Sequence, residues 1–166
     1  MKQKKVAIIM GSDSDMKVMI AATEPLRDFG IKYEIKIVSA HRTPKLMFEF
    51  AEMAEARNFG VIIAGAGGAA HLPGMVAAIT PLPVIGVPVN QTRLKGLDAL
   101  LSVAQMPKGV PVATVAIDNA FNAGLLAAKI LASSDTKLLK KIKMFHNTQK
   151  KKVILANSRL KARHLY

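Results

Sequence analysis

Residues 6–15 read VAIIMGSDSD, an apolar run of five residues that ends in a glycine and four polar residues. Short, nearly continuous apolar runs of this kind are typical of strands in a parallel sheet that is covered on both faces. Further runs of strand length follow along the chain, at residues 33–38, 61–64, 84–87 and 112–116. The pattern therefore predicts five strands in series.

Stretches with helical periodicity separate these runs, and several have clear end signals. Pro44 suits a first helical turn, and Gly30 and Gly60 follow predicted helices as C-terminal caps. The predicted helices span about residues 14–29, 44–58, 70–78, 94–104 and 119–133. Five βα units in this order predict an α/β fold: a three-layer α/β/α sandwich with an open parallel sheet and right-handed crossovers, which resembles flavodoxin.

Length and composition limit the class of protein. The 166 residues fit one ordinary α/β domain, and a content of 51% hydrophobic and 21% charged residues excludes a disordered chain. The absence of cysteine excludes disulfides, cysteine nucleophiles and thiolate metal sites. The first apolar run is far shorter than a signal-peptide core or the ~20 residues of a membrane span. We therefore predict a soluble, cytoplasmic protein.

Positive charge is concentrated at the C-terminus. Residues 1–135 hold 14 Lys and Arg against 11 Asp and Glu, whereas residues 136–166 hold the other 10 basic residues and no acid. We predict a flavodoxin-like domain over residues 1–133 and a basic tail over residues 134–166, whose apolar spacing indicates an amphipathic helix packed on the body or on a neighbouring subunit. The alternative is attachment to nucleic acid or an anionic membrane. With 5% aromatic residues and no Trp to stack bases, we expect neither partner.

Polar residues directly follow three consecutive strand runs, where ligands bind in an open parallel sheet. Ser12 and Ser14 offer hydroxyls beside the unpaired amides of a helix start, which suits a phosphate. Asp15 suits a ribose hydroxyl or an amine, or only caps the helix. Arg42 suits a phosphate or a carboxylate, with a surface salt bridge as the alternative. The three loops span residues 11–15, 39–44 and 65–74. Together they predict a functional site.

Two histidines, His41 and His71, lie at adjacent strand ends. A histidine has a reference pKa of about 6.5 and can exchange a proton near neutrality, so we predict that His41 is a general acid/base. Two histidines with only Asp15 as a third ligand are a weak metal signature, and we expect no metal. Gly65-x-Gly67-x-x-Ala70 matches a relaxed dinucleotide fingerprint, but it lacks the acidic residue expected about 20 positions later. Neither NAD nor ATP is indicated.

Longer blocks around these residues resemble one family. MGSDSD at 10–15, SAHRTP at 39–44, AGAGGAAHLPGM at 64–75, GVPV at 86–89 and QMP at 105–107 resemble, in order and spacing, the class I 5-(carboxyamino)imidazole ribonucleotide mutases of purine biosynthesis. The resemblance runs from about Val6 to Leu131. It implies a cofactor-free, flavodoxin-like catalytic domain that moves a carboxylate from the exocyclic nitrogen of the substrate to ring carbon 4. It also implies a homo-octamer with its sites at subunit contacts.

The resemblance assigns roles to particular residues of this chain. It makes His41 the catalytic acid/base and places Ser12, Asp15 and Arg42 on the ribonucleotide. The other expected pocket residues are Ser14, Ser39, Gly67 and His71. No cofactor, metal, nucleic acid or membrane is implied. A transient contact with the ATP-dependent synthetase that makes the substrate would be consistent with the family.

Other classes of protein are also compatible with the sequence. Class II relatives, which use free carbon dioxide, carry Lys in place of Arg42 and lack the run at 67–71, so the chain sides with class I. A non-catalytic nucleotide-binding module and a nucleic-acid-associated protein are the remaining two hypotheses. The chain departs from the class I pattern in a loop at 117–123 that is shorter by about two residues, and in Leu101, which replaces a common aromatic.

Overall fold

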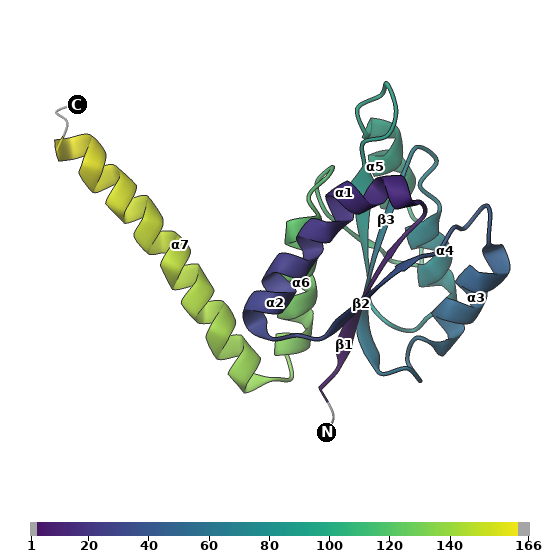
Figure 1. The fold of residues 1–166 in the computed structure, drawn as a ribbon, viewed down its shortest axis with the longest axis horizontal. Helices are drawn as coiled ribbons and strands as arrows, with labels where there is room; N and C mark the ends of the chain where they lie inside the picture. Colours follow the sequence, from purple (N-terminus) through teal and green to yellow (C-terminus); the bar gives the residue numbers. More distant parts are fainter. Residues whose placement is uncertain (1–2, 163–166) are drawn as a thin grey trace.

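The computed structural model describes residues 3–162, which form a parallel five-stranded sheet with helices on both faces (Figure 1). The strands are β1 (Lys5–Met10), β2 (Tyr33–Ile37), β3 (Phe59–Gly67), β4 (Val84–Val89) and β5 (Ala113–Thr114). Their order in the sheet is β2-β1-β3-β4-β5. The predicted three-layer, flavodoxin-like α/β fold is therefore confirmed.

Helices cover the two faces in separate groups, each over its own hydrophobic core. The elements between the strands are η1 (Asp13–Asp15), α1 (Met16–Met19), η2 (Ile20–Ala22), α2 (Thr23–Phe29), α3 (Pro44–Met53), α4 (Leu72–Ile79) and α5 (Leu97–Ala104), and α6 (Ala120–Ala132) and α7 (Thr136–Ala162) follow the last strand. Alternate residues of β1 enter opposite cores: Ile8 packs in the core under α2 and α6, and Ile9 in the core under α3 and α4. This double burial explains why the strand is apolar at every position.

Several local predictions differ from the structure. The first predicted helix is divided into short 3₁₀ and α segments, because Pro25 has no N–H for an α-helical bond and Thr23 Oγ1 bonds the Ile20 carbonyl at 2.8 Å. Gly60 lies inside β3 and does not cap a helix; Asn58 makes the left-handed turn instead, with φ 66°. Gly30 does cap α2, with φ 73°. β3 also continues to Gly67, so the third loop begins later than predicted.

The apolar character of α6 on more than one face is explained within this chain. α6 packs on β3, on the α2 segment and on the first turns of α7. A Cβ at Gly124 would lie 2.2 Å from the Ala22 carbonyl oxygen, so glycine permits this close approach. Exposed apolar surface on α6 therefore provides no argument for an oligomer.

The basic tail forms α7, of which only the first turns pack on the body (Figure 1). Leu138 and Ile142 are buried, and the ring of Phe145 meets Phe29 edge-on at 5.9 Å. Lys141 Nζ donates to the Phe29 carbonyl oxygen at 2.7 Å and neutralises the C-terminal end of α2. Residues 163–166 of the predicted tail lie outside the described residues.

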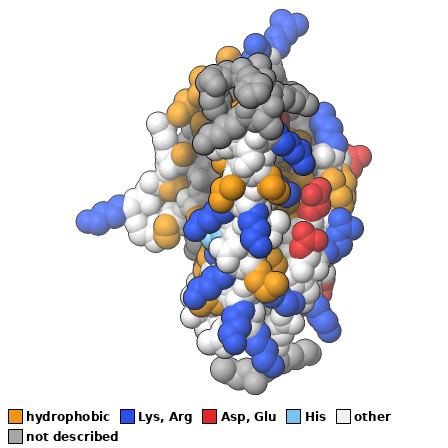
Figure 2. Space-filling model, turned by 90° about the vertical axis from the view of Figure 1, so that its left-hand side faces the viewer, with side chains coloured by type: hydrophobic (Ala, Val, Ile, Leu, Met, Phe, Trp, Pro, Cys, Tyr) orange, Lys and Arg blue, Asp and Glu red, His pale blue; other side chains and the backbone are white. Residues whose placement is uncertain are grey.

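Beyond these turns, α7 projects away from the body (Figure 1). The exposed large apolar side chains of α7 are Leu139, Met144, Val153, Ile154, Leu155 and Leu160. Figure 2, viewed from the α7 side, shows Lys and Arg side chains with hydrophobic ones between them. Across residues 3–162, no helix combines the length and hydropathy needed to cross a membrane.

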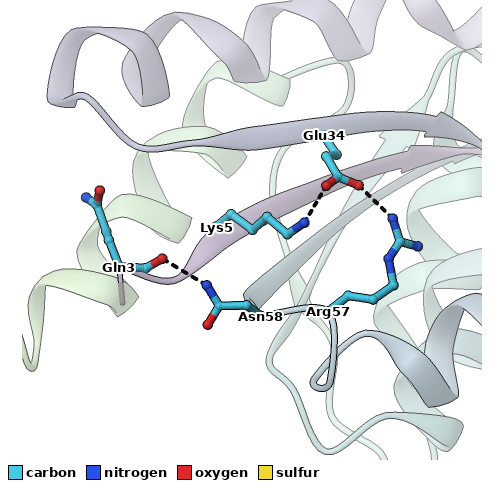
Figure 3. A network of polar contacts seen from close by, with 5 residues as sticks. All are labelled: Gln3, Lys5, Glu34, Arg57 and Asn58. Carbon is cyan, nitrogen blue, oxygen red and sulfur yellow. Dashed lines mark hydrogen bonds and ion pairs between the residues drawn. The ribbon is translucent and has the colours of Figure 1, made fainter. Parts of the chain in front are cut away.

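A polar network connects β1, β2 and the segment before β3. Glu34 of β2 pairs with Lys5 of β1 and, at 2.7 Å, with Arg57 before β3 (Figure 3). Asn58 Nδ2 donates to the Gln3 carbonyl oxygen at 3.0 Å. The hydrogen bond from Lys5 lowers the pKa of Glu34. Because these ion pairs are partly exposed, each contributes little to stability, up to about 1 kcal/mol.

Candidate functional site

A cavity of about 360 Å³ lies at the carboxyl ends of β1, β2, β3 and β4. We call it the site cavity. All eight predicted site residues line it, together with one residue from the loop after β4. The lining consists of Gly11, Ser12, Ser14, Asp15, Ser39, Ala40, His41, Arg42, Ala66, Gly67, Ala69, His71, Leu72 and Gln91. The structure thus brings three separate predicted loops to one place.

The first loop folds into a capping box that fixes Asp15. The Ser12 amide donates to Asp15 Oδ2 at 3.1 Å, and Ser12 Oγ accepts from the Ser14 amide at 3.4 Å. Asp13 Oδ1 also accepts from the Ser14 amide, at 3.0 Å. The amides that we expected to be free for an anion are therefore occupied within the loop.

Asp15 not only caps the helix start but also bonds to another loop through its second oxygen. Oδ1 accepts a hydrogen bond from Gln91 Nε2 at 3.0 Å, and the residue is only 3% exposed. Burial raises the pKa of Asp15 above its usual range, whereas the hydrogen bonds from Gln91 and Ser12 and the charge of Arg42 act in the opposite direction. The carboxylate is therefore held at the wall of the site cavity by one donor on each oxygen.

Arg42 connects the first two loops. Its Nη2 donates to the Gly11 carbonyl oxygen at 3.1 Å, and its Nε donates to Ser39 Oγ at 3.4 Å. Both ion pairs found among the described residues involve Glu34, so Arg42 does not make the surface salt bridge considered from sequence. A second hollow of about 430 Å³ adjoins the site cavity and shares Arg42 with it. Arg42 therefore lies at the boundary between the two hollows.

His41 and His71 are in direct contact. Nε2 of His41 lies 2.8 Å from Nδ1 of His71, and the rings meet edge-on with centroids 4.9 Å apart. In such a pair one nitrogen must carry a proton and the other must accept it, so the two tautomers are coupled. Each ring keeps its other nitrogen for a ligand. Both side chains are exposed in the isolated chain.

The described residues contain no cluster of three or more His, Asp or Glu side chains that could hold a metal ion. The site cavity instead offers a basic guanidinium, a buried carboxylate, hydroxyls and a histidine pair. This set can bind a polar, phosphorylated molecule and exchange a proton with it.

Sequence reasoning missed Gln91, which was not among the predicted site residues. It lies in the segment directly after β4, at the same sheet edge as the other site residues. The strand-end rule that selected Ser12 and His41 would therefore have found it if the fourth loop had been considered.

The open parallel sheet defines a flavodoxin-like α/β protein, and the polar cavity lies at the carboxyl edge, where proteins of this class bind small ligands. Comparison with known proteins identifies the family. The model of the AIR carboxylase family matches residues 5–152, and the chain belongs to this family.

Individual relatives agree over nearly the whole chain. The N5-carboxyaminoimidazole ribonucleotide mutase of Thermotoga maritima is 62% identical over 94% of this chain and 91% of its own length. The phosphoribosylaminoimidazole carboxylase of Saccharomyces cerevisiae is 56% identical over 93% of this chain, which corresponds to 27% of that longer protein. A crystal structure of Treponema denticola PurE superposes with a TM-score of 0.87 at 32% identity, covering 95% of this chain and 99% of that one.

Proposed function

We propose that this protein is a mutase that converts 5-(carboxyamino)imidazole ribonucleotide into 4-carboxy-5-aminoimidazole ribonucleotide in purine biosynthesis. The observation that carries the proposal is the contacting His41 and His71 pair, which lines one cavity with Arg42 and Asp15. The identity of 62% to a protein with the mutase name supports the same reaction.

Substrate binding divides between the two ends of the ribonucleotide. Arg42, which lines both adjoining hollows, binds the phosphate as a planar multidentate donor. Asp15 accepts a hydrogen bond from a ribose hydroxyl, and the hydroxyls of Ser12 and Ser14 supply further polar contacts. The remaining wall residues are Ser39 and Gly67. These contacts with the phosphate and the ribose orient the imidazole of the substrate toward the two histidines.

The reaction needs one proton donated and one proton removed, and His41 performs both steps. In the first step the bond between the exocyclic nitrogen and the carboxylate carbon breaks, its electron pair stays on nitrogen, and His41 protonates that nitrogen as carbon dioxide leaves. In the second step ring carbon 4 attacks the trapped carbon dioxide, and His41 then removes the proton from carbon 4. The histidine ends in its starting state, so no cofactor is consumed.

His71 supports this cycle through its contact with the catalytic ring. The hydrogen bond at 2.8 Å fixes the rotation of the His41 imidazole and leaves its Nδ1 for the substrate. His71 also borders the site cavity on the β3 side, where it can contact the carboxylate of the substrate.

A second candidate is direct carboxylation of aminoimidazole ribonucleotide by free carbon dioxide, because two similar relatives carry the name phosphoribosylaminoimidazole carboxylase. One assay separates the candidates. Purified protein is mixed with 5-(carboxyamino)imidazole ribonucleotide, without ATP, metal or added bicarbonate. The mutase converts it, whereas a carboxylase leaves it unconverted and forms the carboxylated product only from aminoimidazole ribonucleotide supplied with bicarbonate. No carboxylated product from either mixture would refute both.

The proposal includes a homo-oligomer, an octamer by family resemblance. It is supported by the exposed histidines and by a patch of exposed leucines at the same end of the sheet, with Leu94 63%, Leu97 52% and Leu101 46% exposed. A neighbouring subunit would cover these leucines, keep carbon dioxide in the cavity and receive the projecting part of α7. Light scattering after size exclusion tests this: a mass near 17.8 kDa at micromolar concentration contradicts it.

Two further parts of the proposal concern the surroundings of the protein. We propose a cytoplasmic location, which cell fractionation would test. We also propose a transient contact with the ATP-dependent synthetase that supplies the substrate, which would appear as faster transfer of substrate between the two enzymes than free diffusion allows.

A further inference from the structure

Gln91 connects the loop after β4 to the carboxylate of Asp15. Its Nε2 donates to Asp15 Oδ1 at 3.0 Å and lies 3.5 Å from Ser14 Oγ. The other oxygen, Oδ2, accepts from the Ser12 amide. Gln91 is therefore the side chain that completes the hydrogen bonding of a carboxylate that is only 3% exposed.

The chain makes space for this glutamine at Gly67. A Cβ on Gly67 would lie 2.4 Å from Cγ and 2.7 Å from Cβ of Gln91, so the stem of the glutamine occupies the volume that any other residue would fill. The absence of a side chain at position 67 thus lets Gln91 reach across the end of β3 to Asp15.

The loop that carries Gln91 is held at both ends. The Asn90 amide donates to Asp118 Oδ1 at 2.8 Å, and Thr92 Oγ1 donates to Asp98 Oδ2 at the same distance. The residues on either side of Gln91 are therefore fixed, and the side chain is presented to Asp15 from a supported loop. A supported donor loses little conformational entropy when its hydrogen bond forms.

We propose that Gln91 is a positioning residue of this site: it orients the Asp15 carboxylate and keeps it ionised, so that it can accept a hydrogen bond from a sugar hydroxyl. The inference rests on the proposed function, which places the ribose of the substrate on Asp15. Gln91 acts through Asp15 and is not assigned a contact with the reacting atoms.

The charges around Asp15 show why a neutral donor matters there. Arg42 favours the carboxylate, Asp13 opposes it, and His41 and His71 line the same cavity. Burial is the largest influence and raises the pKa of Asp15, and the hydrogen bond from Gln91 is the largest influence that lowers it. Without Gln91, the Asp15 carboxyl stays protonated up to a higher pH. A protonated carboxyl donates a hydrogen bond through its O–H and is a poorer acceptor for a sugar hydroxyl.

The test combines kinetics with a titration that needs no substrate. Gln91→Met keeps the length of the side chain and removes its donor, and Gln3→Met is the matched control at an exposed position outside the cavity. We expect Gln91→Met to raise KM roughly tenfold, as befits a lost hydrogen bond to a charged group, while kcat changes less than about twofold. In the Asp15→Ala background the same substitution should add nothing to KM.

Carbon-13 NMR of the Asp15 carboxyl provides the second readout. In Gln91→Met its titration midpoint should move to higher pH than in the wild type and in Gln3→Met. An unchanged midpoint, or an equal KM effect with and without Asp15, overturns the role of Gln91. Failure of the wild type to convert the substrate overturns the proposed function instead, which separates the two. If Gln91→Met does not fold, Gln91→Leu also removes the donor without adding a charge, and the same upward movement of the midpoint is expected.

Discussion

Replacement of His41 by asparagine should nearly abolish turnover while the substrate still binds. The amide keeps polarity and approximate size, but it cannot exchange a proton at neutral pH, and it is too short to keep the 2.8 Å contact that Nε2 makes with His71. Positioned acid/base catalysis contributes typically ~10²–10⁴-fold to a rate, which corresponds to about 2.7–5.5 kcal/mol of activation free energy. We therefore expect kcat to fall by this factor and the dissociation constant of the carboxylated product, with which wild-type and variant protein can both be titrated, to stay within about threefold.

The assay measures conversion of 5-(carboxyamino)imidazole ribonucleotide without ATP or added bicarbonate, and calorimetry measures binding of the carboxylated product. His146→Asn is the control, because His146 is exposed on α7 and lies outside the site cavity. It should leave both quantities unchanged. Retention of more than about a tenth of the wild-type rate in His41→Asn would refute the assignment of His41 as the acid/base.

Further predictions concern binding, stability and pH. Arg42→Ala should chiefly raise KM, because its guanidinium faces the proposed phosphate position, and an unchanged KM would remove it from that role. Ile142→Ala should lower the free energy of unfolding by about 2–5 kcal/mol in urea denaturation, because Ile142 is only 4% exposed. Ile154→Ala, at an exposed position of the same helix, is the control. An equally small change in both variants would contradict the packing of α7 on the body. The pKa of Asp15 is raised in the folded protein, so the folded state binds more protons than the unfolded state between the ordinary value of 3.8 and the folded value. The wild type should therefore lose stability relative to Asp15→Asn as the pH rises through this range. An equal difference in unfolding free energy at pH 3.5 and pH 7 would refute this.

The sequence is most informative where one physical rule dominates. Strands buried on both faces must be apolar throughout, so β1, β3 and β4 could be located from residue type alone. Parallel strands must expose their carboxyl ends at one edge, so Ser12, His41 and His71 could be assigned to one site before any contact was known.

Prediction fails where the outcome depends on contacts between distant segments. Gly60 looks like a helix cap, yet tertiary pairing draws it into β3. The contact between the His41 and His71 rings depends on the relative heights of two strand ends, which no local pattern specifies. The strand-end rule could have placed Gln91 at the site, but its hydrogen bond to Asp15 depends on the space that Gly67 leaves, which no local pattern specifies.

The contact between α7 and α2 has a consequence for synthesis of the chain. Lys141 bonds the carbonyl of Phe29, a residue 112 positions earlier, and Phe145 covers the Phe29 ring. At about 5–20 residues per second, a ribosome needs roughly 6–22 s to make the intervening chain. During that time Phe29 lacks its contacts with Lys141 and Phe145, and its ring is accessible to chaperones. The first turns of α7 can dock on α2 only after these residues have left the ribosome.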